Sequence, residues 1–333
     1  MASMYETNQV GKRQEISEKI FNVESDKTPF LSLVKKGPVP NQMLMSWQGF
    51  VFPNAPSTGI KDGVAATDPA SIPRVLLEGC AQHFRRQWGV TTLAELTNIA
   101  GVGRNEVGFQ RLQAMTLLKR MIEQQLLSVD DCAVESGETP WTTRGVGSWI
   151  SNSAQSVKPV DATLRNSAAA IYTGAVASLT EAAFRTMLQA AYGETKEPVS
   201  LDGFVGVDLK AVLDDFTQLY PTGTGTSQAK AIYNVAGVGE YQNKVEWLRF
   251  SVGDVRLHLN PFLAVTTSTG AASAYSPKSG YFLNMEMWEV AYLMKPANTN
   301  LSPDGSGTKG FIDAVLGLKC FNPRGQMKVY SNS

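Results

Sequence analysis

The side chains best suited to chemistry are few in this chain and stand far apart. It has two histidines, His83 and His258, and three cysteines, Cys80, Cys132 and Cys320. A zinc, haem or dithiol site needs Cys and His at short spacings such as C-x-x-C or H-E-x-x-H, and the sequence has none of these. We therefore expect no metal site and no cofactor.

The isolated cysteines and histidines favour structural roles. Three separate thiols fit a reducing compartment, and Cys80 and Cys132 are predicted to be small buried hydrophobic residues. His83 stands beside two arginines, with no neighbouring carboxylate or nucleophile, which predicts a histidine on a strand face. His258 alternates with polar residues, which predicts a solvated or hydrogen-bonded strand residue.

Glycine and carboxylate patterns do not build a catalytic site either. Residues 101–108 match G-x-G-x₄-G, which is two residues longer than the dinucleotide-binding fingerprint. A phosphate-binding G-x-x-x-x-G-K-[ST] and a G-x-S-x-G elbow are both missing from the sequence. The carboxylate pairs at 130–131 and 214–215 are predicted to be solvated helix ends. We predict that the protein is not an enzyme.

Composition favours a subunit whose surface is covered by partners. The 333 residues carry 30 basic and 30 acidic side chains, and only 18% are charged, where about 25% is usual. Interface centres are depleted in charge, and zero net charge argues against a dedicated nucleic-acid binder. The N-terminal 30 residues lack the apolar core of a signal peptide, and the longest uncharged stretch, 257–277, is too polar to span a membrane.

The N-terminal third predicts projecting elements. Residues 9–37 read as a charged, short helical arm that ends in Thr28-Pro29-Phe30 and lies over a neighbouring surface. The alternative is a first helix packed on its own domain. Residues 43–52 alternate as a strand, 53–73 form a long loop rich in Pro and Gly, and 74–93 return as a strand. Together they predict an extended hairpin.

The rest of the chain predicts a mixed α+β body. A long helix over 105–129 begins at the N-cap Asn105, with Leu112 on its apolar face and Glu123 among the charges of its outer side. Shorter helices are predicted over 179–192, stopped by Gly193, and over 208–219, capped by Asp208. Strands follow at 245–262, around a Gly-Asp turn at 253–254, at 281–294 as a strand pair, and at 310–323.

This order of elements resembles the major capsid proteins of tailed phages, which share the Hong Kong 97-like (Johnson) fold. Short motifs carry the resemblance in chain order: 13–33, 87–101, 119–127, 145–150, 179–181 and 311–323. The stretches at 84–87 and 268–280 depart from the family pattern. The resemblance implies an N-terminal arm at 1–41, an E-loop hairpin at 42–92, and a peripheral domain at 93–159 with a spine helix at 105–129. An axial domain would span about 160–260, and 261–333 would return to the peripheral domain.

The resemblance implies a shell protein that forms hexamers and pentamers of an icosahedral or elongated phage head around double-stranded DNA. It would assemble in the host cytoplasm and remain in the virion. Its implied partners are further copies of itself, a portal protein, DNA held by non-specific contacts, and a separate scaffolding protein, because the family motif starts near residue 13. The expected inter-subunit contacts are Thr28, Pro29, Phe30, Trp47, Ile60 and Lys61.

Three other classes stay open at this level. An encapsulin-like compartment shell has the same fold and a protein cargo, a tail or fibre component would form rods or trimers, and an α/β enzyme would be a monomer. Lys61 is the only lysine of the hairpin tip. We expect it to be solvated and not cross-linked, because a cross-link needs a positioned asparagine and a carboxylate.

Overall fold

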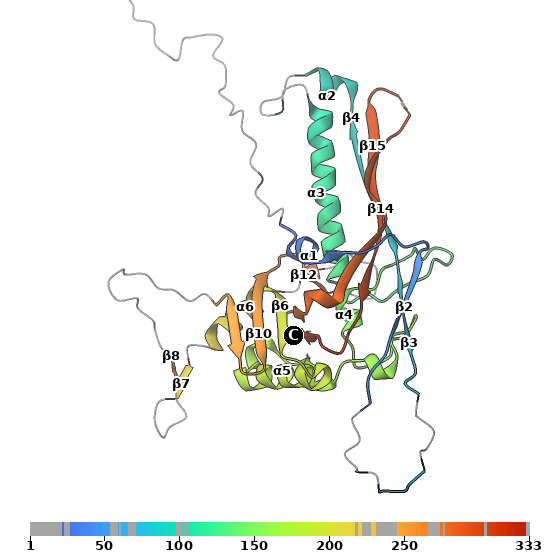
Figure 1. The fold of residues 1–333 in the computed structure, drawn as a ribbon. Helices are drawn as coiled ribbons and strands as arrows, with labels where there is room; N and C mark the ends of the chain where they lie inside the picture. Colours follow the sequence, from blue (N-terminus) through green and yellow to red (C-terminus); the bar gives the residue numbers. More distant parts are fainter. Residues whose placement is uncertain are drawn as a thin grey trace, which may run out of the picture.

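The computed structural model describes residues 22, 27–53, 59, 61–65, 71–97, 102, 105–216, 219–221, 228–230, 245–265, 274–275, 277–302 and 305–330. Figure 1 shows three parts: a tall helix-and-sheet column, a broad sheet with helices beside its base, and a hairpin that projects the other way. Within the described residues, no helix is long and apolar enough to cross a membrane.

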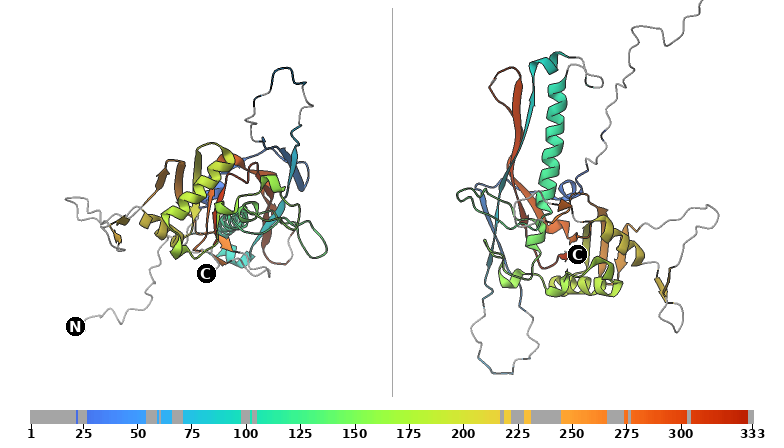
Figure 2. Two further views of the ribbon diagram at one scale, coloured as in Figure 1. Left: turned by 90° about the horizontal axis from the view of Figure 1, so that it is seen from below. Right: turned by 180° about the vertical axis from the view of Figure 1, so that it is seen from behind.

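The column combines one long helix with a four-stranded sheet, and Figure 1 and the right view of Figure 2 show the helix running along the strands. The strand order is β1-β14-β15-β4. These elements are α3 (Glu106–Leu126), β1 (Lys35–Lys36), β4 (Gln82–Val90), β14 (Trp288–Asn300) and β15 (Thr308–Cys320). Leu118, Ile122 and Leu126 of α3 are buried against Phe84 and Trp88 of β4 in one core. In β14 the register against β15 shifts twice, between Tyr292 and Ala297.

The broad sheet has six strands in the order β5-β16-β13-β6-β10-β9. Its strands are β5 (Ile171–Tyr172), β6 (Val199–Val205), β9 (Trp247–Phe250), β10 (Gly253–Leu259), β13 (Gly280–Leu283) and β16 (Met327–Val329). Two helices, α5 (Glu181–Thr195) and α6 (Val207–Asp215), bury their apolar faces against it in a second core. The mixed α+β class is therefore as predicted.

The remaining elements are short. They are α1 (Pro29–Leu33), α2 (Thr92–Leu96), α4 (Val146–Trp149), β2 (Leu44–Gly49), β3 (Val75–Cys80), β7 (Leu219–Pro221), β8 (Gln228–Lys230), β11 (Ala264–Val265) and β12 (Ala274–Tyr275). Single 3₁₀ turns occur at Ala162–Leu164, Ala168–Ala170, Val176–Ser178 and Met285–Met287.

The projecting hairpin is formed by β2 and β3, which pair antiparallel from Leu44–Cys80 to Gly49–Val75. The sequence predicted one returning strand over 74–93. Instead, the strand is interrupted at Ala81, a point that we call the corner, and β4 beyond it pairs with β15 of the column. Alternating apolar residues suit pairing with β2 of the hairpin and with β15 of the column equally well. The sequence pattern therefore could not show where one sheet ends and the next begins.

The predicted helices are present, with corrected ends. Asn105 caps α3 as predicted, because its side chain accepts a hydrogen bond from the Gly108 N–H at 3.3 Å. Helix α5 continues through Gly193 and ends at Thr195, where Lys196 adopts the left-handed conformation with φ 61°. Gly206, not Asp208, is the N-cap of α6.

Two strand predictions also need correction. The hairpin turn between β9 and β10 lies at residues 251–252, while Gly253 is already paired with Phe250. Gly253 is required for close packing, because a Cβ there would lie 2.1 Å from the Val199 carbonyl oxygen. The segment 281–294 is not a strand pair: β13 joins the six-stranded sheet and β14 joins the column.

The buried lysine Lys328 of β16 should make the stability of the folded subunit depend on pH. Burial lowers its pKa to about 8, and its Nζ donates to the Gly147 carbonyl at 2.7 Å. Since the folded pKa lies below the ordinary 10.5, the charged amine destabilises the fold fully below pH 8 and not at all above pH 10.5. Relative to Lys328→Met, the wild-type subunit should therefore gain up to about 3 kcal/mol of unfolding free energy across that interval.

Chemical denaturation of the unassembled subunit at pH 7.5 and pH 10 measures this difference. Lys119→Met removes an exposed lysine from α3 and serves as the matched control. An unchanged difference between wild type and K328M at the two pH values would contradict the proposed cost of burying the charged amine.

Candidate interaction surface and the junctions that position it

A buried carboxylate joins three parts of the chain. Glu123 of α3 is fully buried. Its oxygens accept hydrogen bonds from the backbone N–H groups of Phe30 (2.9 Å) and Leu31 (2.7 Å) and from the Asn260 amide (2.7 Å). Glu123 therefore caps the start of α1 from a distance and ties it to the end of β10. The prediction that Glu123 lies on the outer, charged side of the helix is wrong.

Burial and hydrogen bonding act on Glu123 in opposite directions. Burial is the larger effect and raises the pKa of the carboxyl above its ordinary 4.5, while the bonds from Leu31, Phe30 and Asn260 lower it. The carboxylate is costly to bury, and it is held by three donors that would otherwise lack an acceptor.

Phe30 serves this chain's own core, where the sequence predicted an inter-subunit contact. Its side chain has no exposed area and meets the Phe204 ring edge-on at 5.4 Å. The alternative of packing on its own domain therefore holds for α1. Thr28 and Pro29, the preceding predicted contacts, are half-buried. Residues 9–21 of the predicted arm lie outside the described residues.

Trp47 anchors the root of the hairpin. Its indole N–H donates to the Cys320 carbonyl at 3.0 Å, and its ring lies 5.6 Å from that of Trp149. The side chain is half-buried within its own chain, so only its outer part is open to a neighbour. Trp47 thus fixes how β2 leaves the body.

A second buried junction follows the spine helix. Arg144 is fully buried, and its Nε donates to Asp131 at 2.9 Å while Nη2 donates to the carbonyls of Val157 and Lys158. Burial lowers the pKa of Arg144, and Asp131 opposes that shift. Asp131 also accepts from the Ser156 and Val157 N–H groups. The prediction that Asp131 is a solvated helix end is wrong.

Cys80 and Cys132 form a disulfide, with Cα atoms 5.7 Å apart. Both are buried as predicted, but the prediction of separate thiols is wrong. Their spacing of 52 residues matches no disulfide motif, so only the fold reveals that the end of β3 meets the segment after α3. Cys320 is a free, buried cysteine.

Both histidines have a carboxylate partner from another strand. His83 Nε2 lies 3.2 Å from Asp313 Oδ2, and Arg85 shares that oxygen at 3.5 Å. His258 Nε2 lies 2.9 Å from Asp202 Oδ1. His83 was predicted without such a partner, because Asp313 is 230 positions away. His258 is a hydrogen-bonded strand residue, as predicted.

The hairpin carries exposed apolar side chains beyond its root, which we call the hairpin surface. Phe50 is 56% exposed and Phe52 73% exposed, and the two rings meet edge-on at 5.1 Å. The hairpin surface comprises Phe50, Phe52, Val64, Ile72 and Leu76. Lys61 is exposed beside it, while Ile60 lies outside the described residues. Two aromatic rings in water favour a partner.

Exposed apolar side chains also occur on α2 and α3, and we call this second set the helix surface. It comprises Leu93, Leu96, Leu112, Leu117 and Met121. Leu112 is 65% exposed, although the sequence placed it on the buried face. Leu112 is therefore not part of the buried face that contains Leu118 and Ile122.

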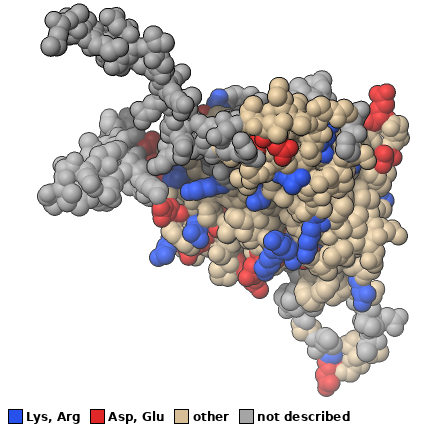
Figure 3. Space-filling view, turned by 90° about the horizontal axis from the view of Figure 1, so that it is seen from above, with Lys and Arg blue, Asp and Glu red and all other residues tan. Residues whose placement is uncertain are grey.

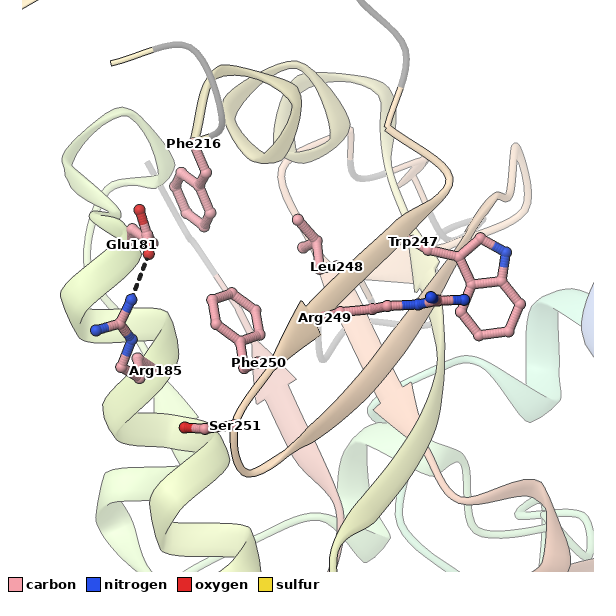
Figure 4. Close-up of a pocket in the computed structure, with 8 residues that line it drawn as sticks. All are labelled: Glu181, Arg185, Phe216, Trp247, Leu248, Arg249, Phe250 and Ser251. Atoms are coloured by element: carbon pink, nitrogen blue, oxygen red, sulfur yellow. Dashed lines mark hydrogen bonds and ion pairs between the residues drawn. The ribbon is translucent and has the colours of Figure 1, made fainter. Parts of the chain in front are cut away.

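A shallow groove of about 390 Å³ lies between α5 and β9 (Figure 4). Phe216 and Phe250 lie toward its interior, and the Glu181–Arg185 ion pair (2.6 Å) closes one side. Trp247 is 46% exposed at the other end. Within the described part of the chain, no group of three or more His, Cys, Asp or Glu could hold a metal ion. The groove offers packing surface.

Charge is sparse and mixed on the face seen from above in Figure 3. Uncharged residues make up most of that face, with basic and acidic side chains interspersed. This agrees with the low charged fraction of the sequence and with a surface suited to protein contacts.

Comparison with known proteins identifies relatives of the chain. A model of the family "SU10 major capsid protein" matches residues 3–332. No curated protein sequence matches. A chain in the capsid structure of the cyanophage P-SCSP1u is similar, with a TM-score of 0.63 at 12% identity, over 96% of this chain and 93% of that one. A chain from Mycobacterium phage Ogopogo has a TM-score of 0.62 at 11% identity, over 99% and 100%. The cyanophage A-1(L) capsid gives 0.62 at 13% identity, over 98% and 97%.

Proposed function

The chain belongs to the SU10 major capsid protein family, and from this premise we propose that it builds its shell through the hairpin and helix surfaces. It is a major capsid protein of a tailed phage and part of the virion. The finer proposal is a Hong Kong 97-like subunit that forms hexamers and pentamers of an icosahedral or elongated head. That head encloses double-stranded DNA.

One observation carries the proposal: a single chain leaves two apolar surfaces uncovered at opposite ends of the molecule. Phe52 on the hairpin is 73% exposed, and Leu93 on α2 is also 73% exposed. Figure 1 shows the hairpin projecting from the base of the column and α2 at its far end. Because the hairpin surface and the helix surface lie at opposite ends of the molecule, we propose that each is covered by another copy of the chain. Such head-to-tail contacts close into rings and shells when the rotation allows.

The proposed contacts also include most of the residues singled out from the sequence. Thr28, Pro29, Trp47, Ile60 and Lys61 are proposed to lie at or beside the neighbouring subunit. Phe30 is left out because its side chain is buried in its own core. Each contact is weak alone, and closing a shell combines many of them, as linked sites always gain avidity.

The proposed assembly has further partners. A separate scaffolding protein and a portal protein would direct shell formation in the host cytoplasm. Packaged DNA would touch the inner wall by diffuse, non-specific contacts, because zero net charge gives no concentrated basic field. The proposed layout keeps the N-terminal arm at 1–41 and the hairpin from 42 to the corner at Ala81. It assigns the column to the peripheral domain and the six-stranded sheet to the axial domain, so that β13 and β16 leave the segment 261–333 that was expected to return to the peripheral domain.

Phe52→Asp is expected to block assembly without unfolding the subunit. The ring is 73% exposed, so its replacement should change the unfolding free energy by no more than about 0.5 kcal/mol. A carboxylate forced into an apolar contact should lower particle yield at least about tenfold, since an unpaired buried charge is costly. Sedimentation of assembly mixtures measures the yield, and circular dichroism measures folding.

Asn152→Asp is the matched control, because it adds the same charge in an exposed turn outside both surfaces. Leu112→Asp should reproduce the loss from the helix surface. Wild-type particle yields from both F52D and L112D would contradict the proposed contacts.

Negative-stain microscopy of the expressed protein tests the function as a whole. Icosahedral particles or capsomer-like rings are expected, and nucleic acid in particles purified from infected cells separates a phage head from an encapsulin-like compartment. Rods or trimers would instead favour a tail component. Monomers alone under assembly conditions would count against a shell protein.

A further inference from the structure

The Cys80–Cys132 pair lies at the corner where the hairpin meets the column. Cys80 is the last residue of β3, and β4 begins at Gln82 in a different sheet. Between them, the Ala81 N–H donates to the Met43 carbonyl at 2.7 Å. Cys132 lies just beyond α3. A bond between the two sulfurs therefore fastens the corner to the segment that follows the spine helix.

Hydrogen bonds position the backbone on both sides of the bond. The Cys132 N–H donates to Asp131 at 2.7 Å, and Asp131 is fixed by the buried Arg144. On the other side, Cys80 is paired with Leu44 in the hairpin ladder. The Cα separation of 5.7 Å lies in the middle of the range found in disulfides, about 4.4–6.8 Å. The backbone therefore presents the two cysteines at a separation suited to a disulfide.

We infer that this pair is a redox-controlled fastener, a dithiol while subunits assemble and a disulfide after the particle leaves the cell. The inference rests on the proposed function, because assembly in a host cytoplasm places the chain in a reducing compartment, where disulfides rarely persist. Lysis moves the finished particle into oxidising surroundings. The sequence-based expectation of a reducing compartment and the disulfide of the structure then describe two stages of one protein.

The step needs a small external disulfide as oxidant. One cysteine thiolate attacks a sulfur of that disulfide, which releases one small thiol and leaves a mixed disulfide on the protein. The second cysteine thiolate then attacks the protein sulfur and releases the other small thiol. Two protein thiols lose two protons and two electrons, one S–S bond forms and one breaks, and the oxidant becomes two thiols.

The bond changes how the hairpin is held. In the dithiol form, non-covalent contacts alone set the corner, chiefly the Ala81–Met43 hydrogen bond and the packing of Trp47 on Trp149. The hairpin then adjusts to its neighbour while the shell closes. In the disulfide form that adjustment is removed. Both cysteines are at most 1% exposed in the disulfide form, so the bond is shielded from external thiols once it has formed. In the dithiol form the less restrained corner must open to admit the oxidant.

Thiol counting on intact particles tests the inference. Infected cells are opened directly into N-ethylmaleimide with denaturant, and a second sample of purified particles is incubated with oxidised glutathione before the same treatment. Mass spectrometry then counts the alkyl groups on the chain. We expect three in cells, on Cys80, Cys132 and Cys320, and one after oxidation, on Cys320.

Two outcomes would overturn the inference. Three labels after incubation with oxidised glutathione would show that the pair does not join, and one label in cells would show that the bond precedes release. Cys132→Ser should carry two labels before and after oxidation. Cys320→Ser, which keeps the pair, should change from two labels to none.

A second measurement links the bond to the particle. Oxidised wild-type particles should disassemble at a higher temperature than reduced ones, while C132S particles should show no difference between the two treatments. Equal disassembly temperatures of oxidised and reduced wild-type particles would contradict the proposed role of the disulfide as a fastener. If no particles form, the proposed function fails, and the label count on the free subunit still shows whether the pair joins.

Discussion

Glu123→Ala is expected to lower the unfolding free energy of the unassembled subunit by about 3 kcal/mol or more. The substitution removes the acceptor for two backbone N–H groups of α1 and for the Asn260 amide, and each orphaned buried donor costs about 1–3 kcal/mol. Because α1 is then no longer tied to the spine helix, assembly should fail as well. Urea denaturation and particle yield are the two measurements.

Glu123→Gln separates charge from hydrogen bonding. Glutamine keeps the size but has one acceptor oxygen, so at least one donor loses its partner and an intermediate loss is expected. Since burial raises the pKa of Glu123, wild type should gain stability relative to E123Q as the pH falls through that pKa. Gln113→Ala, an exposed position on the same helix, should be neutral. An E123A variant with the same unfolding free energy as wild type would contradict the stabilising role of Glu123 at this junction.

Asp131→Ala is expected to destabilise the subunit by about 3–5 kcal/mol, because it leaves the buried guanidinium of Arg144 without its counter-charge. The same carboxylate also orders the backbone at Ser156 and Val157, so the whole segment should become susceptible to proteolysis. Chemical denaturation and limited proteolysis of the unassembled subunit measure the two effects.

The double variant Asp131→Ala with Arg144→Met tests the cause. If the unpaired charge dominates, removing it should restore part of the lost stability, and a double-mutant cycle gives the coupling between the two residues. Glu135→Ala removes an exposed carboxylate four residues away and is the control. A loss below about 1 kcal/mol in D131A would show that the ion pair contributes little.

Sequence patterns predicted the elements that local chemistry determines. Asn105 signalled the start of α3, because an N-cap acts within one turn, and the spacing of Leu118, Ile122 and Leu126 identified its buried side. Helix ends were less predictable. Gly193 suggested a stop, but α5 continued for two more residues and ended on Lys196, because packing against the sheet outweighs the weak cost of one helical glycine.

The sequence could not show which residues far apart in the chain contact one another. Glu123 and Asp131 each looked like solvated carboxylates, since their charge is visible in the sequence while their donors are not. Phe30 lies 93 positions before Glu123, and no periodicity relates the two. The same holds for Cys80 and Cys132, whose meeting depends on the corner at Ala81.

The sequence predicted the projecting hairpin but not its exposed aromatic residues, and its contact with a neighbouring subunit stays a prediction. The hairpin was expected to reach a neighbour, and Lys61 is exposed there. Phe50 and Phe52 were missed, although two aromatic residues at the end of a strand, just before a proline, were a usable signal. Leu112 was assigned to the buried face because it precedes Met115 and Leu118 at intervals of three residues, which is typical of one helix face, but its side chain is exposed.

The two register shifts in β14 have a geometric consequence. Between Tyr292 and Ala297 the strand contains more residues than its partner β15, and such bulges bend a strand and increase its twist. This point divides the column into a lower half, beside the six-stranded sheet, and an upper half that carries α2 (Figure 1). We expect the column to flex there, so that one polypeptide fits both the five-fold and the six-fold positions of the proposed shell without exchanging any of its strand partners.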